Sequence, residues 1–412
     1  MGPSDEIKKL IDLTSLITKG STPTTYGHQF VDESKGEATF IGAYNCSFDG
    51  SAKLDTRKWI TSEANEMLKR SKLADEDSIL CIVGNTIGSS FMVEPSILPA
   101  NINQNVALIR PVKEKVFPLY LKYAIRSPFV QWQVIQEAST QAQPSLSLKQ
   151  VGDFKIFSPS LLEQRKIAKI LSTWDKAIST TERLIDNSKQ QKKALMQQLL
   201  TGAHTQRKRL LDDSGKPFEG EWKEVKLSNV AEVVMGSSPK SSSYNENSEG
   251  LPLIQGNADI KNRKSAPRIY TSEVTKKCSI GDILLSVRAP VGTIAKSEHE
   301  ACIGRGISAI SAKKHHVQEY LYQWLLWFEP RWEKYSQGST FEAVNSNDIK
   351  SLHLAIPEHS EQAKVASVLS NADQEIELLE QQLADLKQEK KALMQQLLTG
   401  KRRVKADDKE VV

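Results

Sequence analysis

The sequence predicts an α+β protein in which two blocks of short strands and helices are joined and separated by two long helices forming an antiparallel coiled coil. The first observation is a duplicated segment, KQQKKALMQQLLTG at 189–202 and KQEKKALMQQLLTG at 387–400, identical at thirteen of fourteen positions. The second is a 4,3 spacing of apolar residues through the stretch before each copy, which is typical of a coiled-coil seam. The third is that each preceding block alternates short strand patterns with turn residues and then an amphipathic helix.

The duplication extends over the whole chain. LLEQRKIAKILSTWDKAIS at 161–179 aligns with HSEQAKVASVLSNADQEIE at 359–377, and GSTP at 20–23 matches GSSP at 236–239. More loosely, SILCIVGNTIG at 78–88 aligns with DILLSVRAPVG at 282–292. A period of this size indicates a duplicated domain and not a solenoid of short repeats.

The two long helices should pair with each other, because either one alone would expose an apolar seam about 60 Å long to water. Gly202 and Gly400 stand where helix C-cap glycines belong. The second seam comprises Val365, Leu369, Ala372, Ile376, Leu379, Leu383, Leu386, Leu393 and Leu397, interrupted at Lys390. The first comprises Ile167, Leu171, Trp174, Ile178, Ile185, Leu195 and Leu199, with Thr181, Ser188 and Lys192 in the remaining slots.

These patterns divide the chain into six segments. The predicted strands of the two blocks are 38–44, 78–84, 105–111, 251–256, 282–287 and 306–312, and the predicted block helices are 119–136 and 317–335. The segments are a first block at 1–158, a helix at 159–202, a linker at 203–221, a second block at 222–357, a helix at 358–400 and a charged tail at 401–412.

Composition and motifs limit the classes of function. A net charge of +5 over 412 residues permits nucleic-acid binding without demanding it, and four scattered cysteines indicate reduced thiols in a cytoplasmic protein. No apolar run of membrane-spanning length is present. The sequence lacks a phosphate-binding GxxxxGKS/T loop, HExxH, GxSxG and the Asn-Pro-Pro-aromatic loop of amino-methyltransferases. We therefore expect a non-catalytic chain with no metal site.

Polar loops in both blocks carry the residue types that bond phosphate oxygens and base edges. Each such residue taken alone is more often ordinary surface, but the set of loops favours DNA. The candidates in the first block are Lys19, Ser21, Thr24, Tyr26, Asn85, Gln104, Gln143 and Ser145. Those in the second block are Lys240, Ser241, Tyr244, Gln255, Asn257, Arg288 and Arg305.

Two variable blocks, each followed by a near-identical long helix, resemble the specificity (S) subunit of type I restriction-modification systems. The resemblance covers essentially the whole chain and is carried by EQRKIAKILSTWDKAI and EQAKVASVLSNADQEI, by the two copies of KKALMQQLLTG, and by the GSTP and GSSP loops. The first block begins abruptly at IKKLIDL, whereas the second has the lead-in EWKEVKL, so the first block either lacks its opening strand or has an altered start.

The resemblance implies that each block is a target-recognition domain reading one half of a split site on double-stranded DNA. It also implies two methyltransferase (M) subunits docked on the helices, with restriction (R) subunits completing the complex. S-adenosylmethionine and ATP with Mg²⁺ would belong to those partners, and no cofactor would bind this chain. For docking we select the outward-facing Gln197, Gln198, Gln395 and Gln396.

Two other functions remain open from the residues alone. A two-headed coiled-coil scaffold that binds proteins or glycans would share the same duplicated layout, but it would show no salt-dependent affinity for DNA. A single-chain nuclease or methyltransferase would need a catalytic motif that the sequence does not contain.

Overall fold

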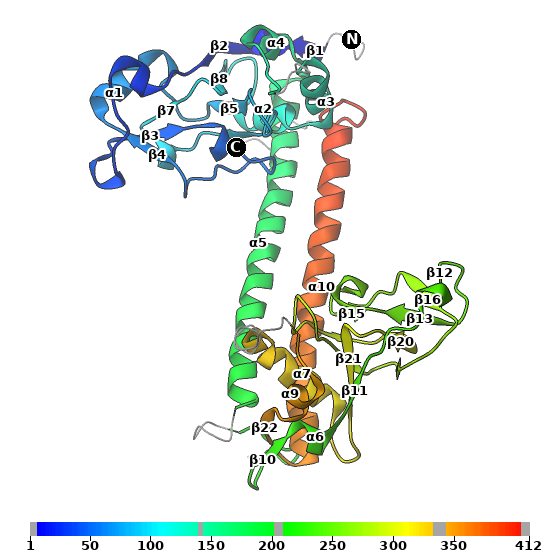
Figure 1. Cartoon of the computed structure of the whole chain (residues 1–412). Helices are drawn as coiled ribbons and strands as arrows, with labels where there is room; N and C mark the ends of the chain where they lie inside the picture. Colours follow the sequence, from blue (N-terminus) through cyan, green and yellow to red (C-terminus); the bar gives the residue numbers. More distant parts are fainter. Residues whose placement is uncertain (1–5, 139–142, 202–208, 333–342, 405–412) are drawn as a thin grey trace. The chain divides into compact units, whose positions relative to one another are not determined.

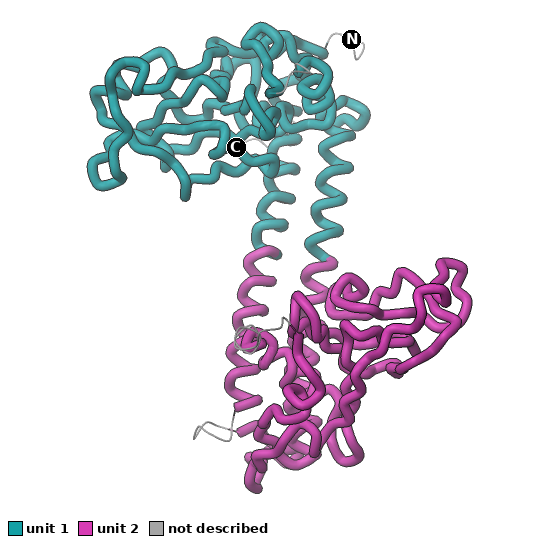
Figure 2. The backbone as a smooth tube through the Cα atoms, in the orientation of Figure 1, with its two compact units in different colours: residues 1–181, 382–412 teal, residues 182–381 magenta. Residues whose placement is uncertain are grey.

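The computed structural model describes residues 6–138, 143–201, 209–332 and 343–404, and these form two compact units. Unit 1 comprises residues 1–181 and 382–412, and unit 2 comprises residues 182–381, so each unit holds one block and parts of both long helices (Figure 2). The predicted C-cap residue Gly202 lies outside the described residues.

The block of unit 1 contains two sheets and a separate strand pair (Figure 1). An antiparallel sheet has the order β2-β8-β5-β6, a second has the order β4-β3-β7, and β1 pairs with β9. Side chains of β8 alternate between two cores: Val106 and Leu108 face the second sheet, and Ala107 and Ile109 face the helices. The strands are β1 Ile7–Lys9, β2 Thr14–Lys19, β3 Ala38–Ile41, β4 Lys58–Ile60, β5 Ser78–Cys81, β6 Ser90–Met92, β7 Ala100–Ile102, β8 Val106–Pro111 and β9 Lys155–Phe157.

The block of unit 2 repeats this plan with more strands. One sheet has the order β11-β21-β18-β19-β15-β14, the other has the order β12-β16-β13-β20-β17, and β10 pairs with β22. The strands of the first sheet are β11 Ala231–Met235, β14 Ile260–Lys261, β15 Lys264–Ser265, β18 Ile283–Ser286, β19 Ile294–Lys296 and β21 Ile307–Ala312. The others are β10 Lys223–Lys226, β12 Tyr244–Asn245, β13 Leu251–Ile254, β16 Ile269–Thr271, β17 Lys277–Cys278, β20 Ala301–Ile303 and β22 His353–Ile356.

The opening strand of the first block is present. β1 pairs antiparallel with β9, as β10 pairs with β22 in unit 2. The turn after β1 buries Leu10 and Leu13. In unit 2 the turn α6 (Leu227–Val230) follows β10 and buries Leu227 and Val230 in the same way. The alternative that this block lacks its first strand is therefore wrong.

The block helices break where proline occurs. The single helix expected at 119–136 is two helices, α2 Pro118–Ile125 and α3 Pro128–Glu137, because Pro128 has no N–H to continue α2 and Ser127 caps the new helix. The helix expected at 317–335 is α7 Gln318–Phe328, followed by a 3₁₀ turn around Pro330, and residues 333–335 lie outside the described residues. The remaining short helices are α1 Ser62–Met67, α4 Leu148–Asp153 and α9 Ser346–Lys350.

The long helices are α5 Leu161–Leu199 and α10 His359–Leu397, and they run antiparallel in each unit. In unit 1 the α5 residue Asp175 pairs with Lys390 near the end of α10, and in unit 2 Lys192 near the end of α5 pairs with Asp373. Every predicted seam residue is buried or half-buried, including both lysines. Gly400 has the left-handed φ of +71° expected of a helix C-cap glycine.

The repeated Glu-Gln motif fastens each block to the start of its long helix. The side-chain oxygen of Gln164 accepts from the N–H of Phe117 at 2.8 Å, and that of Gln362 accepts from the N–H of Val317 at 3.0 Å. Each amide also donates to a proline carbonyl at 2.8 Å, on Pro159 and Pro357 respectively. Buried amides with these partners explain why both copies retain glutamine.

The neighbouring glutamates are held by arginines from the predicted linker and tail. In unit 2 Glu361 forms an ion pair with Arg209, and in unit 1 Glu163 forms one with Arg403. Each long helix is thus followed by an arginine, Arg209 or Arg403, that pairs with the glutamate near the start of the other long helix. The leucines and methionine of each KKALMQQLLTG copy pack into the core beside that contact.

Candidate nucleic-acid interface

The candidate residues of each block gather at one edge of a sheet, where two strands end beside the start of a third. In unit 1, β2 and β5 end beside the start of β8, since Lys19 pairs with Ala107 and Cys81 pairs with Val106. In unit 2, β11 and β18 end beside the start of β21, where Met235 pairs with Ser308. The loops that leave these strands therefore share one edge of the sheet in each block.

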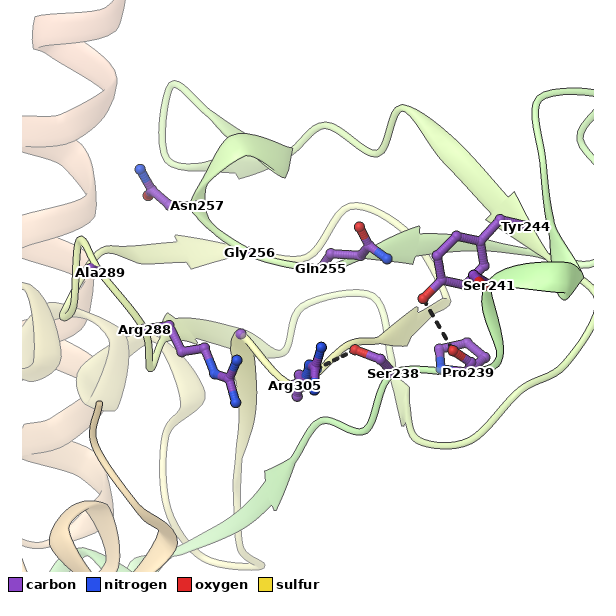
Figure 3. A pocket seen from close by; sticks show the side chains of 11 residues that line it. Ser238, Pro239, Ser241, Tyr244, Gln255, Gly256, Asn257, Arg288, Ala289 and Arg305 are labelled. Atoms are coloured by element: carbon purple, nitrogen blue, oxygen red, sulfur yellow. Dashed lines mark hydrogen bonds between the residues drawn. The ribbon is translucent and has the colours of Figure 1, made fainter. Parts of the chain in front are cut away.

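In unit 2 these loops line a cleft of about 540 Å³ (Figure 3). The loop after β11 contributes Ser238, Pro239 and Ser241, Tyr244 opens β12, and the remaining lining residues follow β13, β18 and β20. Six of the seven residues predicted for this block line the cleft, namely Ser241, Tyr244, Gln255, Asn257, Arg288 and Arg305. The seventh, Lys240, is exposed and does not line the cleft, although its neighbours Pro239 and Ser241 do.

The cleft is cationic and rich in unused hydrogen-bonding groups. Arg288 and Arg305 are exposed, and among the described residues neither forms an ion pair. The side-chain oxygen of Asn257 is buried without a hydrogen-bond partner in the described part of the chain. By contrast, Tyr244 is already fixed, because its hydroxyl donates to the carbonyl of Pro239 at 3.2 Å. Guanidinium and amide groups of this kind suit the acceptors of phosphates and base edges.

In unit 1 the corresponding loops form a contiguous surface. The hydroxyl of Thr22 donates to the side-chain oxygen of Gln104 at 2.7 Å, which joins the loop after β2 to the turn before β8. Val83 bridges to Ser145, which brings Asn85 near Gln143 and Ser145. Lys19, Thr24, Tyr26, Asn85, Gln104 and Gln143 are exposed, whereas Ser21 and Ser145 are half-buried.

Close backbone contact explains the glycine of both GSTP and GSSP. A Cβ on Gly20 would lie 1.6 Å from the carbonyl oxygen of Ile102, and a Cβ on Gly236 would lie 2.1 Å from that of Gly304. Only glycine allows the chain leaving the strand to cross its neighbour at this distance. The two hydroxyl-rich loops are consequently placed in the same way against the turn that carries Gln104 or Arg305.

Two residues at this surface in unit 1 escaped the sequence analysis. Tyr44 is 41% exposed beside Asn103, and it lies beyond the end of β3 at Ile41, whereas the sequence pattern predicts a strand over 38–44. Arg70 donates to the carbonyl of Lys19, but it lies in a helical segment and not in a loop rich in glycine and serine. The tyrosine in the GAYNCS stretch, directly after an apolar strand, was the available signal.

The sequence alignment of 78–88 with 282–292 differs by one residue from the correspondence that the structure shows at this edge. Val83 bridges to Ser145, and Arg288 makes the matching bridge to Ala343, so Arg288 corresponds to Val83 and not to Gly84. The loop of unit 1 is one residue longer before the glycine with positive φ that closes it, Gly88 or Gly292.

The glutamines selected for partner docking have different surroundings. Gln395 and Gln396 are exposed, and Gln198 is half-buried. Gln197 is exposed, but its side-chain oxygen accepts a hydrogen bond from the indole N–H of Trp327 at 3.2 Å. Docking through these residues stays a prediction.

Among the described parts of the chain, no group of three or more His, Cys, Asp or Glu residues is arranged to hold a metal ion. None of the described helices has the length and apolarity needed to span a bilayer.

Comparison with known proteins agrees with this architecture. A family model for the type I restriction modification DNA specificity domain matches residues 6–188 and again 219–388. The chain is 35% identical over 306 residues to a protein described as the MjaX specificity subunit of a type I restriction enzyme in Methanocaldococcus jannaschii, covering 73% of this chain and 72% of the relative.

Solved structures show the same fold. A chain from a structural study of complex assembly and conformational transition of the type I R-M system superposes with a TM-score of 0.63 at 23% identity, covering 96% of this chain and 98% of that one. The S subunit of a type I restriction-modification system from M. genitalium superposes with a TM-score of 0.60 at 12% identity, covering 95% of each chain.

Proposed function

Because the chain belongs to the family of type I restriction-modification specificity subunits and carries two copies of the DNA specificity domain, we propose that it reads a split, asymmetric DNA site. Each block reads one short word, and the bases between the words are not read. The observation that carries the proposal is the recurrence of one polar sheet edge in both blocks, lined by different side chains.

The two words differ because the side chains at the two edges differ. The cleft of unit 2 presents two exposed guanidinium groups, Arg288 and Arg305, whereas the corresponding surface of unit 1 presents mainly amides and hydroxyls. Guanidinium groups favour guanine or phosphate, and amides favour adenine. A chain with two unlike readers recognises a site without two-fold symmetry.

The long helices provide the site for the partner subunits. Each has 39 residues and is therefore about 58 Å long. The two helix ends share the sequence KKALMQQLLTG, which suits two copies of one methyltransferase subunit. Restriction subunits join this complex. The chemistry belongs to the partners, which bind S-adenosylmethionine and ATP with Mg²⁺, while this chain binds DNA in the cytoplasm and catalyses no step.

Salt-dependent binding tests the proposal against the scaffold alternative. The complex of this chain with its methyltransferase subunit is titrated onto duplex DNA at 50 to 200 mM salt. A DNA reader loses affinity with a log–log slope of about −0.9 for each phosphate neutralised. The proposal is abandoned if the complex, folded and able to bind S-adenosylmethionine, has the same negligible affinity at every salt concentration.

A further inference from the structure

The turn that precedes the central strand of each block places one side chain at the same position of the two readers. Gln104 lies two residues before β8, and Arg305 lies two residues before β21. Both follow a strand in parallel pairing, since Ile41 pairs with Ile102 and Ile254 pairs with Ile303. The strand registers on both sides therefore make Gln104 and Arg305 structurally equivalent.

The same loop hydroxyl supports both residues. Thr22 and Ser238 are each the third residue of the GSTP or GSSP loop. The hydroxyl of Thr22 donates to the side-chain oxygen of Gln104 at 2.7 Å, and that of Ser238 accepts from the backbone N–H of Arg305 at 3.2 Å (Figure 3). The Gln104 amide keeps its NH₂ group and a second lone pair on its oxygen, which are the two groups needed to bond adenine at N7 and N6.

The turns are shaped differently while the position is preserved. In unit 2, Gly304 and Gly306 flank Arg305, and a Cβ on Gly306 would lie 2.3 Å from the carbonyl oxygen of Gln255. In unit 1 the flanking residues are asparagines, and the side-chain oxygen of Asn103 accepts from the N–H of Asn105 at 2.9 Å. Each turn thus has its own means of projecting an exposed side chain.

A role in neutralising phosphate does not fit this pair. A position that serves mainly to neutralise DNA phosphates needs a cation in both blocks, but the residue of unit 1 at this position, Gln104, is a neutral amide. The two residue types are, however, the usual partners of two different bases: arginine contacts guanine at O6 and N7, and glutamine contacts adenine at N6 and N7.

We infer that residues 104 and 305 occupy one base-selecting position common to both blocks, at which Gln104 selects adenine in the first word and Arg305 selects guanine in the second. This inference rests on the proposed DNA-reading function and names the residue that sets one base of each word.

The test exchanges the two residues in the complete complex with the methyltransferase subunit. The wild-type motif is obtained first by methylome sequencing, and binding is then measured on duplexes in which each read base pair is replaced in turn. Gln104→Arg is expected to change the preference at one position of the first word from adenine to guanine by roughly 5- to 150-fold, with the second word unchanged. Arg305→Gln is expected to produce the reverse change in the second word alone.

The unaltered word serves as the internal control for folding, and Gln136→Arg adds the same charge to an exposed position of α3 outside these loops. The inference is overturned if both exchanges leave the motif unchanged, or if they weaken all sequences equally, as loss or gain of a phosphate contact would. If one variant misfolds and no longer recognises either word, the result of the other exchange decides whether the inference stands. A wild-type complex without any sequence preference would instead remove the proposed function itself.

Discussion

Removing the arginine that holds Glu163 is the most informative test of how the chain end contributes to unit 1. The Glu163 side chain is 6% exposed at the start of α5. Arg403 donates to its two carboxylate oxygens at 2.9 and 2.7 Å, and the N–H of Val404 donates at 3.1 Å. Arg403→Ala would leave this carboxylate buried, with the N–H of Val404 as its remaining donor among the described residues.

The expected loss is about 2 kcal/mol of unfolding free energy. Breaking a buried ion pair costs about 3–5 kcal/mol, but the Arg403 side chain is 51% exposed, so water can replace part of it. For a unit of about 200 residues, in which 1 kcal/mol shifts Tm by about 2–4 °C, the unit 1 transition should fall by about 4–8 °C. Differential scanning calorimetry of the purified chain measures this shift.

The pH dependence of the loss identifies its cause. Burial raises the pKa of Glu163, but hydrogen bonds from Arg403 and Val404 outweigh it and hold the pKa below its ordinary value. A depressed pKa in the folded state stabilises the protein above the unfolded value of about 4.3 and ceases to do so as pH falls through the folded value. The difference between wild type and Arg403→Ala should therefore be full at pH 7 and shrink below about pH 4.

Arg402→Ala is the matched control, since Arg402 is exposed and, among the described residues, its backbone N–H rather than its side chain makes the hydrogen bond, to the carbonyl of Gln396. Equal Tm shifts for Arg402→Ala and Arg403→Ala, or a difference that persists undiminished at low pH, would refute the reasoning.

Three further changes test other parts of the structure. Lys390→Ala should destabilise the helix pair by about 1–2 kcal/mol in urea unfolding, because its buried ammonium is paired with Asp175 in the seam. Replacing the exposed neighbour, Lys391→Ala, should change the unfolding free energy by less than about 0.5 kcal/mol, and equal effects would contradict the pairing. Gly20→Ala should abolish binding to the first word while leaving the second, because its Cβ would collide with a backbone carbonyl; methylation of an unchanged full motif would show that the loop placement is wrong. Arg288→Ala should weaken DNA binding by the complex with the methyltransferase subunit, with a salt slope smaller by about 0.9 if its contact is a phosphate; unchanged affinity and specificity would remove it from the interface.

The sequence patterns that are local or repeated predicted the structure well. The seam spacing predicted both long helices and their buried faces, including the positions of Lys192 and Lys390, because a heptad pattern directly encodes one helix face. The polar residues chosen at and just after the predicted strands include six that line the unit 2 cleft, because strand ends converge at a sheet edge.

Features that depend on contacts distant in sequence were missed. Arg403 and Glu163 are 240 residues apart, and nothing in the local pattern of a charged tail indicates which buried acid it meets. The break at Pro128 could have been predicted, since Ser-Pro signals a new helix start. The one-residue displacement between Val83 and Arg288 could not, because loop length differs between two weakly similar copies and only the strand register fixes the correspondence.

The most direct test of the central claim is methylome sequencing of cells that carry this chain and the methyltransferase subunit of its own operon, compared with cells that lack only this chain. We predict a bipartite, asymmetric N6-methyladenine motif that appears only when the chain is present, with two different words and an unread spacer. Absence of any motif, although the methyltransferase subunit is folded and binds S-adenosylmethionine, would contradict the account and favour the two-headed scaffold.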